Sequence, residues 1–150
     1  MLADMPQGFT AYQLTLHIKS PIQIGVGKLG DCSFAAGFYI YTGSAKRNIE
    51  SRLARHLKKY KKLRWHIDYL TVHTLVEVVQ VTRSHQSECT LNQAVDGIVL
   101  VNGFGSSDCH NRCSSHLRYL GDFLPVASCL DLETHISKWH WFSRMGCEKI

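Results

Sequence analysis

The chain has 150 residues, of which 45% are hydrophobic and 19% are charged, as is typical of a globular protein. We expect residues 1–150 to form a single domain that buries roughly two thirds of the unfolded surface. No apolar run approaches the ~20 residues of a membrane helix, and the first residues lack the layout of a signal peptide. We therefore expect a cytoplasmic protein without membrane contact, with its six cysteines reduced.

Positive charge is concentrated in one stretch. The formal net charge is +5, and nine of the seventeen lysines and arginines lie between Lys46 and Arg64, where Glu50 is the only acid. Such a local field favours a polyanion, most simply DNA, because binding releases condensed counterions. The alternative is a solvated helix face. The candidate nucleic-acid-binding residues are Lys46, Arg47, Arg55, Lys58, Lys59 and Lys62.

Alternating apolar residues predict strands at the start of the chain. Residues 11–18 (AYQLTLHI) alternate, and the following Ser20-Pro21 pair predicts a turn into a second strand at 22–26. We therefore expect these two strands to form a hairpin. Residues 31–36 are expected to be a linker.

A third strand is predicted at residues 37–41, with Tyr39 and Tyr41 on one face. Tyr39 is expected to pack in the core. Gly43 and Ser44 are expected to form the turn into a helix, since glycine allows a tight change of direction. In that helix Arg52 and His56 lie four residues apart on one flank. Its expected apolar stripe consists of Ile49, Leu53, Leu57 and Tyr60.

Further elements are predicted in the second half. Residues 64–70 indicate a short helix or turn, and the β-branched run at 71–81 predicts a buried strand. A helix begins after Ser87, a plausible N-cap, and residues 97–105 predict a short strand that ends in a glycine loop. The apolar side of that helix is expected to be Leu91, Ala94 and Val95. Trp139, Trp141 and Phe142 are expected to pack back on the body.

Several short sequence motifs follow one another along the chain. They are Tyr12 before a strand, GFYIYTGSA (37–45), SRLARHL (51–57), WHIDYL (65–70), SEC (87–89), GFGSSDC (103–109) and SHL (115–117). Together they resemble the small stand-alone branch of the GIY-YIG nuclease superfamily, the Uri-type endonucleases. The resemblance spans a core at about residues 12–120 and leaves 121–150 as a C-terminal extension.

The resemblance implies a fold, an activity and a site. The fold is an α/β (α+β) domain with a small central, mainly antiparallel sheet flanked by helices. The activity is hydrolysis of phosphodiester bonds with one divalent metal ion. Tyr12 and Tyr41 are similar to the tyrosines of the two half-motifs. Arg52 is similar to the catalytic arginine, His56 to the residue one turn later, and Glu88 to the metal-binding glutamate.

These residue types suit the chemistry. Glu88 offers a hard oxygen to Mg²⁺ or Mn²⁺, and Arg52 can fork onto the non-bridging phosphate oxygens. Alternatively, Glu88 is an acid in a first helical turn, where it opposes the helix dipole. Asp68 and Glu77 are reserve ligands. His66 and Asp68 could touch substrate, but we favour a structural hydrogen-bonded pair.

The general base is predicted to be Tyr41. A tyrosine has an ordinary pKa near ~10, so Lys46, Arg52 and the metal ion would have to favour its phenolate. Tyr12 and His56 would position the water and the phosphate. His56 is the alternative base, because its ordinary pKa suits neutral pH. The sequence does not choose between the two.

Cysteine and histidine are gathered near residue 110. Cys109, Cys113 and His116, with Asp108 before them and Cys89 as a further candidate in space, have the soft-ligand character that suits Zn²⁺. The spacing matches no standard zinc finger. We therefore favour reduced thiols beside a glycine loop, with Asp108 and His116 holding that loop by hydrogen bonds.

The sequence therefore predicts a metal-dependent DNA endonuclease of GIY-YIG type. The alternative is a non-catalytic nucleic-acid-binding module of the same fold. Retention of Tyr41, Arg52 and Glu88 together favours the enzyme, because binding alone does not require a carboxylate near phosphates. The sequence does not distinguish DNA from RNA, and target choice could come from a protein partner.

Overall fold

The computed structural model describes residues 8–106 and 113–122. Within them the chain forms a four-stranded antiparallel sheet, a two-stranded sheet and short helices, which confirms the predicted α+β class. The elements are β1 (Ala11–Ile18), β2 (Ile22–Gly25), the 3-10 helix η2 (Gly27–Leu29), β3 (Asp31–Phe34), β4 (Gly37–Ser44), α1 (Ile49–Leu57), α2 (His66–Thr71), β5 (Val76–Ser84), α3 (Glu88–Gln93) and β6 (Leu117–Gly121).

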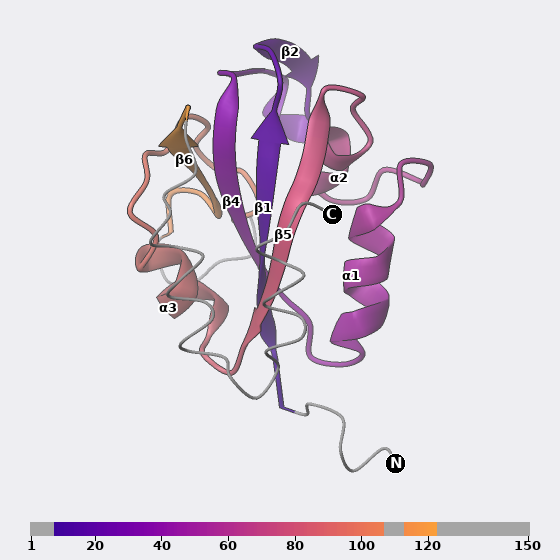
Figure 1. Ribbon diagram of the computed structural model, residues 1–150, viewed down its shortest axis with the longest axis vertical. Helices are drawn as coiled ribbons and strands as arrows, with labels where there is room; N and C mark the ends of the chain where they lie inside the picture. The colour runs from indigo at the N-terminus through magenta and orange to yellow at the C-terminus, as the bar shows by residue number, and fades with distance from the viewer. Residues whose placement is uncertain (1–7, 107–112, 123–150) are drawn as a thin grey trace.

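Strand β1 is the centre of the fold. The strand order is β5-β1-β4-β6, so β1 pairs antiparallel with β4 on one side and with β5 on the other (Figure 1). Leu14, Leu16 and Ile18 are buried on one face of β1, and Ala11 and Thr15 are buried on the other. Because both faces and both edges are covered, β1 fixes the positions of the strands beside it.

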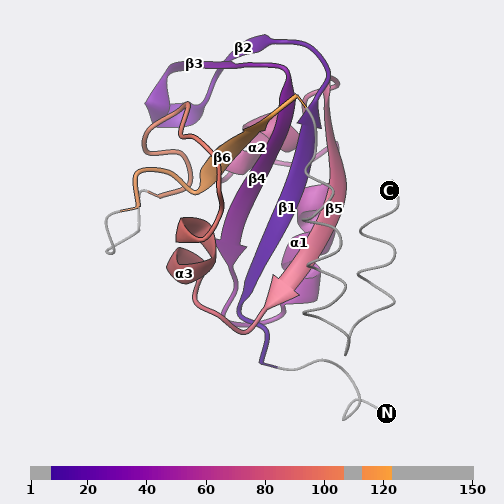
Figure 2. The same ribbon diagram turned by 60° about the vertical axis from the view of Figure 1, so that its left-hand side comes forward.

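The helices flank the end of β4. In Figure 1, α1 lies beside the β5 edge and α3 lies on the opposite side of the molecule, below β6. Figure 2 shows α1 and α2 behind the sheet. Strand β4 runs antiparallel to β1 and ends at Ser44, at the lower end of the sheet in Figure 1. Side chains from α1 and α3 can therefore meet there.

The predicted hairpin of residues 11–18 and 22–26 is wrong. Strand β2 pairs with β3, and the two form a separate sheet. Strand β3 occupies most of residues 31–36, the predicted linker. β2 has no place beside β1 because β4 and β5 already fill both edges of that strand.

Strand β4 is longer than predicted. It continues to Ser44 instead of ending at Tyr41, so Gly43 and Ser44 are strand residues and do not form a turn. The change of direction falls after them, and Asn48 caps the helix in a left-handed conformation with φ 51°. The side chain of Asn48 accepts a hydrogen bond from the backbone N–H of Ser51. An N-cap of this kind satisfies a donor that the first turn leaves unpaired.

The apolar stripe predicted for α1 is wrong in its second half. Leu53 and His56 are buried, whereas Leu57 is 45% exposed and Tyr60, beyond the helix, is 93% exposed. Position 56 faces inward because it lies three residues after Leu53 on the same side of the helix. Its imidazole is compatible with burial because Tyr12 provides a hydrogen-bond partner.

In the second half of the chain, a short helix or a turn is predicted at residues 64–70, and the structure has a helix there, α2. The strand after it starts at Val76, not at 71, because α2 extends to Thr71. Ser87 is confirmed as the N-cap of α3, since its side chain accepts a hydrogen bond from Thr90 N–H. The apolar side predicted for α3 is wrong at Ala94, which is exposed, whereas Leu91 and Val95 are half-buried. The buried residue of this helix is Asn92, whose side chain donates to Ser115 O at 2.8 Å.

The strand predicted at residues 97–105 is also wrong. That segment makes a single bridge, between Ile98 and Tyr119. The edge of the sheet is instead formed by β6, which pairs with β4. Trp139, Trp141 and Phe142 lie outside the described residues. Across residues 8–106 and 113–122, no helix has the length and apolar character that crossing a membrane would require.

Candidate functional site

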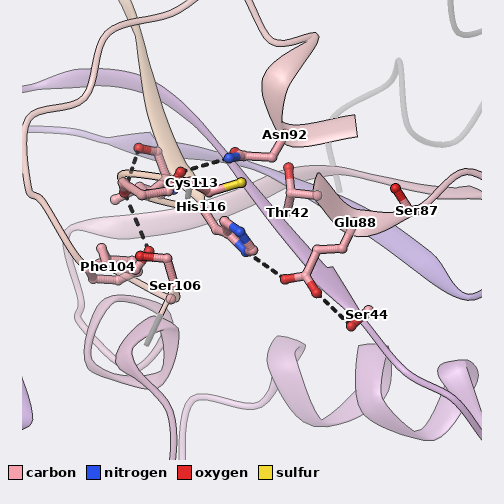
Figure 3. Close-up of polar contacts among 12 residues, drawn as sticks. Thr42, Ser44, Ser87, Glu88, Asn92, Phe104, Ser106, Cys113 and His116 are labelled. Atoms are coloured by element: carbon pink, nitrogen blue, oxygen red, sulfur yellow. Dashed lines mark hydrogen bonds and ion pairs between the residues drawn. The ribbon is translucent and has the colours of Figure 1, made fainter. Parts of the chain in front are cut away.

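Ser44, the last residue of β4, joins a cation to a carboxylate. Its backbone carbonyl accepts a hydrogen bond from Arg52 Nη1 of α1 at 2.7 Å. Its hydroxyl donates to Glu88 Oε1 of α3, also at 2.7 Å (Figure 3). Arg52 and Glu88 are distant in sequence, and the end of one strand brings both to the same place.

Glu88 is held from two sides. Besides the Ser44 bond, its Oε2 lies 2.6 Å from His116 Nδ1 (Figure 3). Burial raises the pKa of Glu88, but the hydrogen bonds from His116 and Ser44, with Arg52 nearby, outweigh it and lower that pKa below its ordinary value. The side chain is 25% exposed and ionised at neutral pH. An ionised, partly exposed carboxylate fits Mg²⁺ or Mn²⁺, which bind hard oxygen.

The two tyrosines and the histidine of the predicted site come together. Tyr12 Oη is hydrogen-bonded to His56 Nε2 at 2.7 Å, and both side chains are buried. The ring of Tyr41 lies 6.5 Å from that of Tyr12 and 6.2 Å from that of His56, between centroids. These contacts require β1, β4 and α1 to be packed in the observed register, in which Tyr12 lies opposite Gly43.

Gly43 serves the site by leaving space. It is a strand residue without a positive φ, so the predicted role in a turn is wrong. A Cβ at this position would collide with the hydroxyl of Tyr12, across the strand pair. Gly105 has a related role, because a Cβ there would come 2.9 Å from Cε1 of Tyr41. Both glycines let a tyrosine side chain approach the backbone closely.

Burial sets the protonation states in this cluster. It raises the pKa of Tyr12 and that of Tyr41 well above the ordinary tyrosine value, and Arg52 acts in the opposite direction on both. Burial, together with the charge of Lys61, lowers the pKa of His56 to about 4. At neutral pH the two tyrosines are therefore phenols and His56 is a neutral imidazole.

An open pocket lies at the cationic side of the site. It measures about 460 Å³ and is lined by Ser44, Ala45, Lys46, Arg47 and Arg52. The side chains of Lys46 and Arg47 are exposed. Three cations and a strand end around an open pocket make a site where an anion such as a phosphate group can bind.

Trp65 supports the arginines of α1. The guanidinium carbons of Arg52 and Arg55 lie 4.7 Å and 4.5 Å from the centre of its ring. Cations over the face of an indole are attracted by its quadrupole, so Trp65 helps to orient both side chains. Beyond Trp65 the two arginines differ, because Arg55 turns to Asp68.

Asp68 organises the far end of α1. It is fully buried and accepts from Arg55 Nη1 at 2.9 Å and from the backbone N–H groups of Arg64 and Trp65. Burial raises the pKa of Asp68, but the hydrogen bonds from Arg55 and from the backbone lower it by more. The pKa of Asp68 therefore lies below its ordinary value. Lys61 lies 3.8 Å away. Asp68 is therefore structural, and its partner is Arg55, not His66 as predicted.

The other lysines predicted to contact DNA differ in their surroundings. Lys59 donates to the backbone carbonyls of His73 and Val76, so its ammonium is engaged within the protein. Lys58 and Lys62 are exposed. Both follow the C-terminal end of α1, whereas Lys46 and Arg47 line the pocket before its N-terminal end.

The reserve ligand Glu77 and the two residues expected to be structural, His66 and Tyr39, make the following contacts. Glu77, on β5, lines a different pocket of about 190 Å³, together with Lys59 and Thr71. His66 Nδ1 accepts a hydrogen bond from Gly105 N–H at 2.8 Å, which ties α2 to the glycine loop. Tyr39 is buried and donates to Ala35 O at 2.7 Å, in agreement with the predicted packing role.

The structure describes part of the predicted cysteine and histidine cluster. Cys109 and Asp108 lie outside the described residues. Cys113 and His116 lie close together, and the third member is Cys89 of α3. One ligand atom from each of these three residues lies within 4.8 Å of the others.

Three features of the site do not follow from the sequence. The sequence predicts a turn at Ser44 and a zinc-ligand or loop role for His116, and it predicts no role at the site for Trp65. The serine and histidine bonds to Glu88 depend on the packing of α3 beside β4, which no local pattern reports.

Comparison with known proteins gives one family. A family model described as "Domain of unknown function DUF123" matches residues 11–138, which is most of the chain. No curated protein and no solved structure matches the chain. The matched range contains β1, β4, α1, α3 and β6, the elements that carry the site described above. The chain belongs to the DUF123 family.

Proposed function

We propose that this protein is a metal-dependent endonuclease of GIY-YIG type that hydrolyses phosphodiester bonds in DNA. One observation supports this most: Ser44 holds the guanidinium of Arg52 and the carboxylate of Glu88 at the end of one strand. A phosphate contact needs only the cation. An ionised carboxylate beside it has a use when a divalent metal ion must also be held.

The cations bind and orient the phosphate. Lys46 and Arg47 draw the DNA backbone into the pocket, and Arg52 donates to the non-bridging oxygens of the phosphate to be cleaved. Trp65 and the carbonyl of Ser44 keep the Arg52 guanidinium in one orientation, which lowers the entropy lost on binding.

Glu88 is the proposed ligand of Mg²⁺ or Mn²⁺, and Ser44 and His116 hold its carboxylate in place. When bound, such an ion supplies Lewis acidity and a water molecule of lowered pKa. Glu88 also lies in the first turn of α3, so the structural interpretation of this residue is compatible with the catalytic one.

The buried tyrosines and His56 act on the water. We propose Tyr41 as the general base: burial opposes loss of its proton, so Arg52 has to favour the phenolate when substrate is bound. His56 is the alternative base, since it is neutral at pH 7 and accepts protons. Tyr12, paired with His56, positions the water.

The test is cleavage of plasmid, branched and single-stranded DNA, and of RNA, with Mg²⁺ or Mn²⁺. Wild type is compared with Glu88→Gln, which removes the charge but keeps the shape, and with the matched control Glu77→Gln on β5. We expect Glu88→Gln to lose at least ~100-fold in rate while DNA binding stays largely intact. The control variant should cleave like wild type.

Two results would contradict the proposal. Undiminished cleavage by Glu88→Gln would remove its metal role. If wild type binds DNA but cleaves no substrate with either ion, the protein is a non-catalytic nucleic-acid-binding module that uses the same basic pocket.

A further inference from the structure

A group of possible metal ligands lies next to Glu88. It consists of Cys89 on α3 and of Cys113 and His116 on the segment that leads into β6. One ligand atom of each lies within 4.8 Å of the others. In a tetrahedral zinc site the ligand atoms are roughly 3.5 to 3.8 Å apart, from bond lengths of ~2.0 to 2.3 Å. The three ligand atoms therefore lie near the separation that a shared ion requires.

The nature of the ligands selects the ion. Two thiol groups and one imidazole are soft or intermediate donors, which suit Zn²⁺ and not Mg²⁺. His116 is buried, whereas Cys89 and Cys113 are half-buried, so an ion can reach the cluster from solvent. Gln93 Nε2 also donates to Cys113 Sγ at 3.6 Å, a bond that stabilises a thiolate.

The hydrogen bond between His116 and Glu88 fits a metal-bound histidine. His116 Nδ1 lies 2.6 Å from Glu88 Oε2, and Figure 3 shows the sulfur of Cys113 on the side of the ring turned away from Glu88. Metal-ligating histidines commonly donate the other ring N–H to a carboxylate, which fixes tautomer and orientation. With Nδ1 donating to Glu88, Nε2 is the nitrogen whose lone pair would bind the ion.

We propose that Cys89, Cys113 and His116 form a zinc site. Each thiol gives up its proton when its sulfur binds the ion, so the site forms with release of two protons. The three residues fill three tetrahedral positions, and water or another ligand fills the fourth. The ion joins α3 to the segment before β6, and through His116 it orients the carboxylate of Glu88. The zinc site does not depend on the proposed nuclease activity.

The test is metal binding by the full chain in a non-thiol reductant. Wild type is stripped with a chelator and titrated with Co²⁺ and then with Zn²⁺. We expect a thiolate-to-cobalt charge-transfer band that one equivalent of Zn²⁺ abolishes. Cys89→Ser and Cys113→Ser should each weaken Zn²⁺ affinity at least ~10-fold. The matched control is Cys32→Ser, a buried thiol of β3 away from the cluster, which should bind like wild type.

A second measurement does not depend on the variants folding. Thiols of wild type are alkylated with and without Zn²⁺ and mapped by peptide mass spectrometry. Zn²⁺ should protect Cys89 and Cys113, and a chelator should restore their reactivity. Absence of the charge-transfer band, or unchanged alkylation of both cysteines with Zn²⁺, would overturn the site whether or not the protein cleaves DNA.

Discussion

The two ends of helix α1 are both basic but use their cations differently. Before its N-terminal end, Lys46 and Arg47 are exposed and line the pocket with Arg52. Toward its C-terminal end, Arg55 pairs with the buried Asp68. The two ends share one charge sign, and they differ in whether a buried acid lies within reach. A run of positive charge therefore does not identify a nucleic-acid contact until the partner of each cation is known.

The largest expected effect concerns Asp68, which pairs with Arg55 toward the C-terminal end of α1. Asp68→Asn keeps the shape of the side chain but leaves Arg55 and Lys61 without their buried counter-charge. We expect a loss of about 3 kcal/mol in the free energy of unfolding, since breaking a buried ion pair costs more than breaking an exposed ion pair. Urea denaturation measures it. Asp31→Asn, an exposed acid of β3, is the control and should change little. Equal losses in both variants would refute a structural role for Asp68.

The pH dependence of stability is the next effect in size. The folded pKa of His56 is lowered to about 4, so the unfolded chain binds the proton more tightly. Stability is therefore complete above the unfolded pKa of ~6.5 and decreases as pH falls from there to about 4. The decrease is on the order of 2 to 3 kcal/mol. Denaturation from pH 7 to 4 should show it in wild type but much less in His56→Gln.

The smallest expected effect concerns the exposed cations at the two ends of α1. We expect Lys46→Ser with Arg47→Ser to weaken DNA binding and to reduce the slope of log affinity against log salt by about 1 to 2, because each phosphate contact contributes ~0.9. Lys58→Ser with Lys62→Ser removes the same charge at the other end of α1 and is the matched control. Fluorescence anisotropy at several salt concentrations measures both. Equal reductions would mean that DNA covers the whole helix.

Features set by neighbouring residues were predictable from the sequence. Apolar alternation gave β1 with its observed bounds, and Ser87 before Glu88 gave the cap of α3. Features set by long-range pairing were not. The sequence does not predict that β2 and β3 pair, or that β6 forms the edge of the sheet, because strand pairing depends on which edges are already occupied.

The candidate site shows the same division. The resemblance pointed to Tyr12, Tyr41 and His56, and the structure packs these three side chains together. It did not reveal that Gly43 makes room for Tyr12, because that contact crosses two strands. The sequence names Cys89 as a further candidate of the cysteine cluster, and folding brings α3 and the segment before β6 together, so that Cys89 lies beside Cys113 and His116.

We propose that Arg52 acts in the chemistry, whereas Arg55, three residues later on the same helix, stabilises the fold. Arg52→Ala and Arg55→Ala should be compared by single-turnover DNA cleavage and by urea denaturation. We predict that Arg52→Ala loses at least ~100-fold in cleavage rate and about 1 kcal/mol in stability or less. Arg55→Ala should lose about 3 kcal/mol but keep its cleavage rate while folded. Equal losses of cleavage in both variants, or wild type that cleaves nothing, would contradict the claim.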